Sequence, residues 1–325
     1  MKVNKHVNLG NGIYSVDARY ICPGNACCYL MIEGDQVAII ETGTAYTAEG
    51  IHEALISLGF GIESVRYIVP THVHLDHAGG AGVLMQRYPN AQLAIHPRGA
   101  RHMINPDKLI EGSKAVYGEE KFTQFYGKII PVSADRVLII EDGEKLYLEN
   151  RVLEFRHTPG HAGHHFCIWD QASQGWFSGD TFGISYAAMA SDLDRFIIPT
   201  TSPVQFDPDK LLASIDLLMS YGPKRFFLTH YSVVEEPRKK ADLLREQIEC
   251  YREIAYSLCH EPDREQKILL AVKKMTLTKI SSAQPSLDLK AVEKLLELDF
   301  ILNAQGINIW ASKQEQKKKS DVGIK

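Results

Sequence analysis

One short segment of the chain concentrates side chains that can bind metal ions. Residues 69–82 read VPTHVHLDHAGGAG, so three histidines and one aspartate fall within six residues. Neutral imidazole nitrogens and carboxylate oxygens are ligands of zinc, and also of iron and manganese. In an extended loop, alternate residues can project toward a common point. The pattern therefore predicts that His72, His74, Asp76 and His77 bind metal.

Three later segments carry side chains that could complete such a site. TPGH ends at His161, SGD ends at Asp180, and FLTH ends at His230. Each segment adjoins an expected strand, and loops held by a rigid scaffold often carry chemistry. Taken singly, each of these residues has an ordinary structural explanation. Their order along the chain, after the first cluster, favours a shared metal site.

Composition and length exclude several classes of protein. The chain has 325 residues, of which 45% are hydrophobic and 23% charged, with a net charge of −4. These values are typical of globular proteins. We find no signal-peptide core, no apolar run of roughly 18 residues, and no basic footprint outside the last residues. We therefore expect a cytoplasmic protein that acts on a small-molecule substrate, without nucleic-acid or membrane partners.

The elements that must position the candidate ligands alternate between strand and helix at first. Residues 27–43 predict two strands joined by a turn, and residues 47–61 predict a helix with apolar side chains at helical spacing. Residues 64–70 predict a short buried strand that leads directly into the histidine cluster. Residues 97–125 predict helical material. The middle of the chain predicts short strands separated by turns, and the region after 236 predicts helices.

The order HxHxDH, TPGH, SGD and a histidine at a strand end resembles the metallo-β-lactamase-fold hydrolase superfamily. The resemblance covers roughly residues 10–232, and the motifs are similar to those of glyoxalase II and of bacterial lactonases. It implies an α/β fold, an αβ/βα sandwich of two mixed β-sheets with helices outside. We expect a catalytic domain over residues 1–235, a helical extension over 236–312 and a flexible tail over 313–325. The extension could cover the site or form a homodimer surface.

The resemblance also implies a dinuclear metal site. It assigns seven ligands to two metal ions, namely His72, His74 and His161 to the first, Asp76, His77 and His230 to the second, and Asp180 to both. Two divalent ions are implied, with zinc favoured and iron or manganese as alternatives. The implied reaction is hydrolysis of a thioester, lactone or phosphoester bond by a hydroxide between the metals, oriented by Asp76 as a catalytic residue.

Further residues are expected around the ligands. Glu41 stands in an ETG sequence where the family commonly has Asp-Thr-Gly, an acid that supports the metal loop. We expect Glu41 to keep that role with altered tuning of the metal. His165 is expected to be a structural support. His164, Tyr186 and Arg195 are candidates for the substrate pocket.

Two other functions remain as alternatives. The first is a diiron protein that handles oxygen or nitric oxide, which the histidine at position 74 and the lack of an attached flavodoxin-like segment disfavour. The second is a regulatory protein that retains metal without turnover, which the complete ligand set disfavours. A hydrolase is the favoured interpretation.

Overall fold

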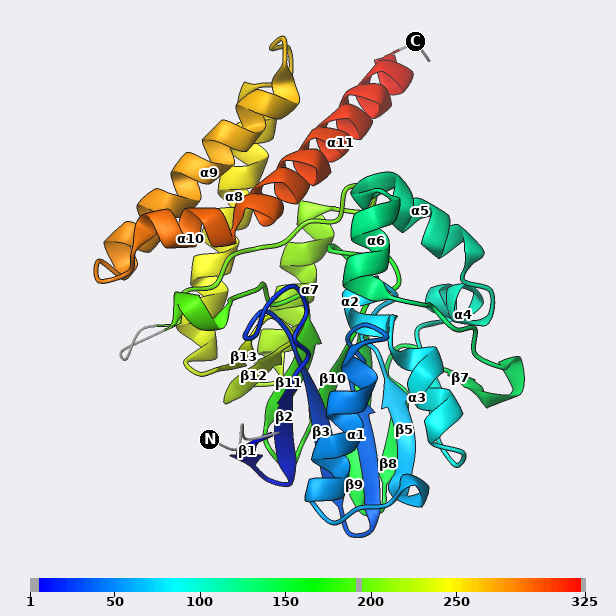
Figure 1. Cartoon of the computed structure of the whole chain (residues 1–325). Helices are drawn as coiled ribbons and strands as arrows, with labels where there is room; N and C mark the ends of the chain where they lie inside the picture. The colour runs from blue at the N-terminus through cyan, green and yellow to red at the C-terminus, as the bar shows by residue number, and fades with distance from the viewer. Residues whose placement is uncertain (1–5, 191–194, 323–325) are drawn as a thin grey trace.

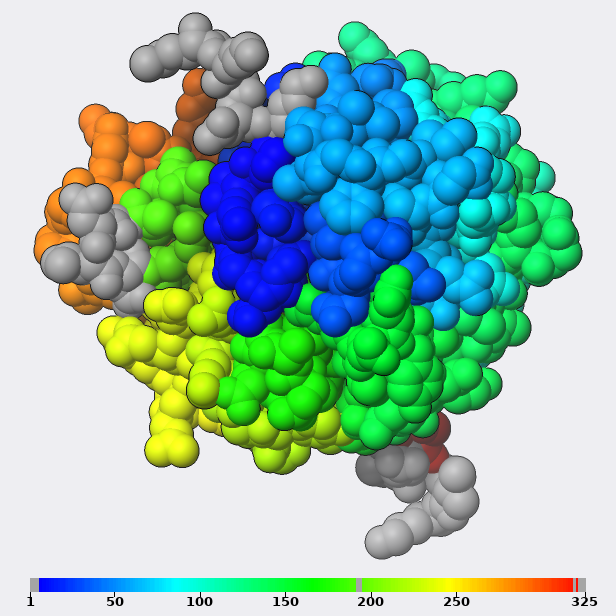
Figure 2. All heavy atoms as spheres, turned by 90° about the horizontal axis from the view of Figure 1, so that it is seen from below, coloured from blue at the N-terminus to red at the C-terminus, as the bar shows by residue number. Residues whose placement is uncertain are grey.

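Two mixed β-sheets packed face to face form the centre of the structure, a computed structural model that describes residues 6–190 and 195–322 (Figure 1). Helices cover the outer faces of both sheets, which confirms the predicted αβ/βα sandwich. Viewed from the end away from the C-terminal helices, the first part of the chain and the middle part lie side by side as two layers (Figure 2).

The first sheet is formed by the N-terminal part of the chain. In spatial order, its strands are β1 (Val7–Gly10), β2 (Ile13–Asp17), β3 (Cys27–Glu33), β4 (Gln36–Ile40), β5 (Val65–Val69), β6 (Gln92–Ile95) and β7 (Val137–Ile139). The strands of the second sheet are, in spatial order, β13 (Ser232–Val234), β12 (Arg225–Leu228), β11 (Gly175–Gly179), β10 (Phe166–Asp170), β9 (Arg151–His157) and β8 (Lys145–Leu148). Both sheets mix parallel and antiparallel pairs.

Aromatic side chains fill the space between the two sheets. Tyr29, Phe155, Phe166, Phe177 and Phe227 each expose no more than 1% of their surface. The rings of Phe177 and Phe227 stack with centroids 4.5 Å apart. Burying one such side chain stabilises a fold by about 1.5–3 kcal/mol. This inter-sheet core fixes the strand ends from which the candidate ligands project.

The adjacent thiols of Cys27 and Cys28 lie on opposite faces of β3. Cys27 packs in the core between the sheets, whereas Cys28 packs in the core under the outer helices. Alternation along a strand produces this arrangement, because successive side chains point to opposite faces. Burial raises the pKa of the Cys27 thiol to about 12. Both thiols therefore serve as packing groups in hydrophobic cores.

The helices α1 (Thr47–Ser57), α3 (Ala81–Arg87) and α4 (Pro97–Ile104) pack against strands of the first sheet. The helices α2 (Leu75–Ala78), α5 (Asp107–Tyr117) and α6 (Glu119–Tyr126) lie toward the end of the sandwich where the C-terminal helices gather (Figure 1). The expected apolar face of the first helix is confirmed, because Ala48, Ile51 and Leu55 are all buried. The expectation of helices over 97–125 is also confirmed. The α7 helix (Pro208–Ser220) packs on the second sheet, where Trp176 donates to the carbonyl of Leu218 (3.0 Å).

Four helices follow the second sheet and gather at one end of the sandwich (Figure 1). They are α8 (Pro237–Ser257), α9 (Arg264–Ala283), α10 (Leu289–Leu295) and α11 (Glu297–Val322). One hydrophobic cluster runs from Trp176 in the second sheet through Leu218 and Leu244 to Ile307 and Trp310 in α11. The predicted boundary at 235 therefore separates segments of the chain but does not separate two hydrophobic cores.

The flexible tail predicted from residue 313 is wrong for residues 313–322. The α11 helix continues to Val322, and residues 323–325 lie outside the described part of the chain. Lys313 donates to the carbonyl of Val204 (2.6 Å), and Glu315 pairs with Arg264 (2.7 Å). Lysine, glutamine and glutamate have high helix propensity, so a charged segment that reads as solvated can extend a helix that is already anchored.

None of the helices within residues 6–190 and 195–322 has the length and apolar content needed to cross a bilayer.

His96 caps α4 and gives a prediction about acid stability. Its Nδ1 accepts a hydrogen bond from the Arg98 N–H (3.0 Å), which requires an unprotonated nitrogen. Burial, with the nearby His157 ring, lowers the pKa of His96 from 6.5 to about 4. Its contribution to stability is therefore complete above pH 6.5 and is lost as the pH falls through 4.

We expect His96→Asn to reduce the pH dependence of folding, because asparagine caps helices without titrating. Between pH 7 and pH 4, the free energy of unfolding should fall less in the variant, by about 1 kcal/mol after allowance for solvent screening. Urea denaturation at pH 7, 5.5 and 4 measures the difference. His260→Asn, at an exposed position, is the control. Parallel curves for His96→Asn and the unaltered protein would refute the capping argument.

Candidate metal centre

Loops at one edge of the two sheets bring the seven predicted ligands together. The loop after β5 leads into α2, so the first turn of this helix holds Asp76 and His77. His161 lies between β9 and β10. Asp180 and His230 follow β11 and β12, which pair in parallel and therefore end at the same edge.

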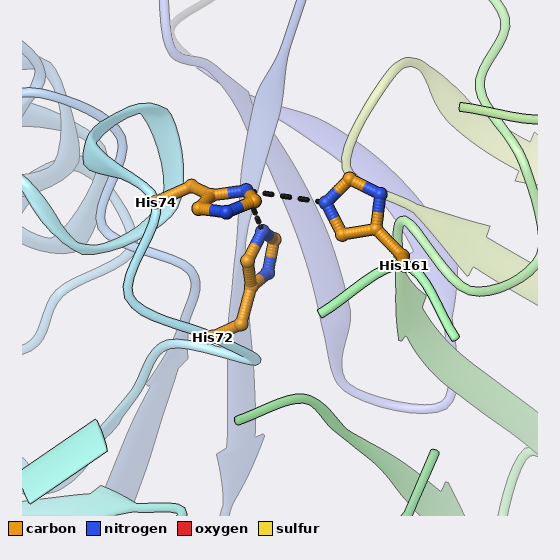
Figure 3. Close-up of side chains that lie close together, drawn as sticks. All are labelled: His72, His74 and His161. Atoms are coloured by element: carbon orange, nitrogen blue, oxygen red, sulfur yellow. Dashed lines mark hydrogen bonds between the residues drawn. The ribbon is translucent and has the colours of Figure 1, made fainter. Parts of the chain in front are cut away.

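Three histidines form the first group. Nδ1 of His74 lies 2.8 Å from Nε2 of His72 and 3.1 Å from Nε2 of His161 (Figure 3). The three nitrogens point toward one another from two different loops (Figure 3). This is the arrangement expected of three ligands to one ion, with a further position open to water or substrate.

Asp76, His77 and His230 form the second group. Oδ2 of Asp76 lies 3.3 Å from Nε2 of His230 and 3.7 Å from Nε2 of His77. The Asp180 carboxylate lies between the groups: its Oδ1 is 3.3 Å from Nε2 of His77, and its Oδ2 is 3.4 Å from Nε2 of His161. One carboxylate oxygen therefore faces each group, as a bridging ligand requires.

The buried polar atoms of the centre fit a pair of metal ions. Nε2 of His77 and Oδ1 of Asp180 are both buried and make no hydrogen bond with any of the residues that the structure describes, although buried polar groups are normally satisfied. Burial, aided by the neighbouring imidazoles, lowers the pKa of His74 to about 3 and that of His72 well below its usual range. Both rings are therefore in the neutral form that binds metal.

The second group has the opposite electrostatics. Burial opposes the charged form of His77, but the carboxylates of Asp180, Glu41 and Asp76 raise its pKa well above 6.5. The same carboxylates favour a cation at this position. A divalent ion would displace the proton and satisfy the same negative charge, so metal binding here should release protons.

Outward-facing ring nitrogens of the histidines are held by hydrogen bonds. The pairs are Nδ1 of His72 with the Thr71 hydroxyl (3.1 Å), Nδ1 of His161 with the Thr200 carbonyl (3.3 Å), and Nδ1 of His230 with the Asn25 carbonyl (2.8 Å). A carbonyl partner fixes the tautomer in which Nδ1 carries the hydrogen and Nε2 faces the centre. Sequence reasoning missed Asn25 and Thr200, because any residue can supply a backbone carbonyl and the residue type therefore gives no indication of this role.

Glu41 lies beneath the metal loop and holds it from several sides. It follows β4 with a φ of +64° and exposes 1% of its surface. Its Oε1 accepts hydrogen bonds from the hydroxyls of Thr71 (2.6 Å) and Thr229 (2.9 Å) and contacts Nδ1 of His77 (3.0 Å). Its Oε2 accepts from the backbone N–H of Thr71 (3.1 Å). One glutamate thus joins the loops that carry ligands to both predicted ions.

We expect Glu41→Gln to weaken metal binding by about 10–100-fold, the usual cost of losing a carboxylate that orients a ligating histidine. The amide keeps the size of the side chain but removes the charge that the His77 ring faces. Competition with a fluorescent chelator measures the affinity. Glu63→Gln, at an exposed position before β5, is the matched control. Equal affinities in the two variants would contradict the orienting role.

His165 contacts the backbone that carries the bridging carboxylate. Its Nε2 accepts a hydrogen bond from the Asp180 N–H (3.2 Å), and its Nδ1 lies 2.9 Å from the Thr158 hydroxyl. The ring therefore fixes where the loop after β11 begins. These contacts are those of a structural support.

Two of the candidate pocket residues differ in their surroundings. The His164 ring lies 5.6 Å from the His74 ring and 6.1 Å from the His72 ring, and its Nδ1 is buried without a hydrogen-bond partner. Arg195 donates to the carbonyl of Tyr231, the residue after His230. The structure thus places His164 against the first group and Arg195 behind the loop of the second.

Tyr186 leads to a residue that sequence reasoning missed. Its ring edge faces the His230 ring at 5.9 Å, and its hydroxyl donates to both oxygens of Asp299 in α11 (2.9 and 3.0 Å). Burial raises the pKa of Asp299 to about 7. The sequence feature that could have pointed to Asp299 is an acidic residue within the otherwise apolar segment 298–302, LDFIL.

Phenolic side chains surround the second group together with Asp299. The hydroxyls of Tyr20 and Tyr126 are 3.0 Å apart, and the Tyr20 ring lies 6.5 Å from the His230 ring. Tyr117 stands against Tyr126 with ring centroids 5.7 Å apart. These residues come from the loop after β2 and from α5 and α6, so distant segments of the chain build this side of the centre.

Comparison with known proteins agrees with this geometry. A family model described as the metallo-beta-lactamase superfamily matches residues 23–230. The chain is 26% identical over 246 residues to the metallo-beta-lactamase fold-containing protein ST1585 of Sulfurisphaera tokodaii, covering 73% of this chain and 87% of that protein. It is 27% identical over 193 residues to the acyl-coenzyme A thioesterase MBLAC2 of Homo sapiens, covering 54% of this chain and 65% of that protein.

A solved structure extends the likeness of fold beyond the sandwich. The metallo-beta-lactamase family protein TTHA1429 of Thermus thermophilus superposes with a TM-score of 0.66 at 20% identity. The superposition covers 95% of each chain, so it includes most of the C-terminal helices.

Proposed function

Because the chain belongs to the metallo-β-lactamase superfamily, we propose that it is a dinuclear metal-dependent hydrolase that cleaves a small-molecule substrate. The two ions would be held by His72, His74 and His161 on one side and by Asp76, His77 and His230 on the other, with Asp180 between them. Zinc is the proposed metal, because a histidine-rich ligand set with carboxylates suits it.

The observation that carries this proposal is the position of Asp180. Its two oxygens face Nε2 of His77 (3.3 Å) and Nε2 of His161 (3.4 Å), which belong to different groups. Alone, either group would support a mononuclear site. A buried carboxylate shared between them favours two ions held close together.

The residues around the centre would have different roles in the reaction. Bound divalent ions would lower the pKa of a water from 15.7 toward about 7 and polarise the substrate oxygen. Burial opposes ionisation of Asp76, but His77 and His230 lower its pKa to about 2, so its carboxylate stays charged. That carboxylate is 20% exposed, so it can accept a hydrogen bond from the attacking water and orient it. The Asn25 carbonyl meanwhile keeps the Nδ1 hydrogen of His230 away from the reacting atoms.

Among thioesters, lactones and phosphoesters, we propose a thioester as the substrate. The support is the likeness to an acyl-coenzyme A thioesterase, which is a property of that relative. A thiolate leaving group also needs less protonation than an alkoxide, because its conjugate acid has a pKa near 8.5 rather than near that of an alcohol. The experiment below compares the three classes directly.

The test couples metal analysis with a substrate panel. Protein purified without added metal is expected to contain two metal ions per chain by plasma mass spectrometry. It should hydrolyse an acyl-coenzyme A with a higher kcat/KM than a γ-lactone or bis-p-nitrophenyl phosphate. Chelation should remove activity, and zinc should restore it. Undiminished hydrolysis after complete chelation would overturn the proposal, and iron with oxygen consumption would favour the redox alternative.

A further inference from the structure

Beside the first histidine group lies a helix whose charges are all positive. The α4 helix reads PRGARHMI, with Arg98 and Arg101 exposed, His102 half-buried, and no acidic residue. Lys108, the second residue of α5, adds a fourth basic group near His102. Within residues 6–190 and 195–322, no carboxylate forms an ion pair with Arg98, Arg101 or Lys108. The whole chain has a net charge of −4, so this cluster of positive side chains differs in sign from the protein as a whole.

Contacts connect these cations to the metal centre. The Arg98 guanidinium covers Gly163, because a Cβ built on this glycine would come within 2.9 Å of Nη1. The His102 ring lies 6.4 Å from the His164 ring, which in turn lies 5.6 Å from the His74 ring. Arg98 thus lies against the residue that precedes His164, and the His164 ring lies between those of His102 and the predicted ligand His74.

His164 supplies a second observation, independent of the arginines. It exposes 7% of its surface, and its buried Nδ1 has no hydrogen-bond partner among the described residues. A buried polar atom of this kind is costly unless something bonds to it. Because the ring lies near those of both His74 and His102, this unsatisfied nitrogen belongs to the region between α4 and the first group.

The opposite side of the centre has a different chemical character. Around His230 stand the hydroxyls of Tyr20 and Tyr186 and the carboxylate of Asp299. An anionic substrate group would be attracted by the exposed Arg98, whereas the carboxyl group of Asp299 offers it no attraction. The electrostatics therefore favour a substrate orientation in which the anionic group of the substrate lies toward α4.

We propose that Arg98 and Arg101, with His164 beside them, form a subsite for an anionic group on the non-reacting part of the substrate. The group is a phosphate or a carboxylate, both of which match the planar donor geometry of a guanidinium. This inference rests on the proposed function and deepens it, because it makes the substrate of the metal centre an anion. Because Arg98 and Arg101 are exposed, their charges act mainly on substrate binding.

The test compares three thioesters that share a chemical bond and differ in charge. The neutral reference is an acetyl thioester of N-acetylcysteamine. Acetyl-coenzyme A adds phosphates on the leaving group, and the glutaryl thioester of N-acetylcysteamine adds a carboxylate on the acyl group. We expect Arg98→Glu to lower the ratio of kcat/KM for one charged thioester to that for the reference by about tenfold, mainly through KM. Whichever charged thioester shows the loss identifies the anion.

Arg66→Glu is the matched control, because Arg66 is exposed at the beginning of β5, far along the strand from the metal loop. This variant changes the net charge equally and should leave both ratios unchanged. Arg98→Lys should recover part of the preference. Ratios that fall equally in Arg98→Glu and Arg66→Glu, or that fall in neither, would overturn the subsite.

A binding measurement separates this inference from the proposed hydrolysis. Calorimetric titration of the metal-loaded protein with adenosine 3′,5′-bisphosphate, and separately with glutarate, needs no turnover. We expect one of the two anions to bind and its Kd to rise about tenfold in Arg98→Glu but not in Arg66→Glu. Failure of both anions to bind would overturn the subsite. Binding with no hydrolysis of any thioester would instead overturn the proposed function alone.

Discussion

An Asp180→Ala variant is expected to lose bound metal and hydrolytic activity together. Its carboxylate lies 3.3 Å from Nε2 of His77 and 3.4 Å from Nε2 of His161, so its removal takes away a contact between the two histidine groups. Metal ions supply several kcal/mol of transition-state stabilisation, and each 1.36 kcal/mol is a tenfold change in rate. We therefore expect kcat/KM to fall by roughly 10²–10⁴-fold, measured together with metal content by plasma mass spectrometry.

The control and a double variant sharpen this test. Asp209→Ala removes an aspartate from the exposed surface of α7 and should retain both ions and full activity. His72→Ala/Asp180→Ala removes one ligand from the first group as well as the bridge. A metal-depleted double variant with full hydrolysis would refute the metal mechanism.

Arg151→Met is expected to destabilise the protein by about 3–5 kcal/mol, the cost of leaving one member of a buried ion pair without its partner. Arg151 at the start of β9 pairs with Asp170 at the end of β10, with Nε 2.9 Å from Oδ1 and Nη2 2.5 Å from Oδ2. Its Nη1 also donates to the carbonyl of Asn11 in the turn between β1 and β2 (2.6 Å). Urea denaturation of the metal-loaded protein measures the loss.

A surface pair provides the comparison. Arg87→Met breaks the pair with Glu49, whose side chain is 62% exposed, and should cost about 0–1 kcal/mol. Arg151→Met/Asp170→Leu should recover part of the stability, because no charge is then left buried. A loss in Arg151→Met no larger than that in Arg87→Met would show that solvent reaches Asp170.

The candidate ligands could be proposed from the sequence because imidazole and carboxylate side chains are recognised by residue type. Clustered histidines and an aspartate after an apolar strand have few structural explanations, and TPGH, SGD and FLTH repeat the strand-then-ligand pattern. The structure brings all seven side chains to one edge. The position of Glu41 was predicted from the resemblance instead, and the structure gives its carboxylate partners in Thr71, Thr229 and His77.

Other parts of the metal centre cannot be predicted from residue type. The Asn25 and Thr200 carbonyls act through backbone atoms that every residue has. Asp299 lies more than 60 residues beyond His230, and only tertiary packing brings it to Tyr186. The helical end of α11 was missed for a related reason, because Lys313 and Glu315 are held by partners distant in sequence.

The hydrophobic cluster shared by the second sheet and the C-terminal helices makes these helices part of one cooperative unit. A fragment ending at residue 235 would strip the cover from Trp176 and Leu218 and would be prone to aggregate. Because these parts of the protein are packed together, binding at the metal centre should also affect the C-terminal helices. Since Asp299 touches Tyr186 beside the metal centre, occupancy of that centre should slow amide hydrogen exchange in α11. The helical extension then serves as a reporter of metal binding at the adjoining edge of the sandwich.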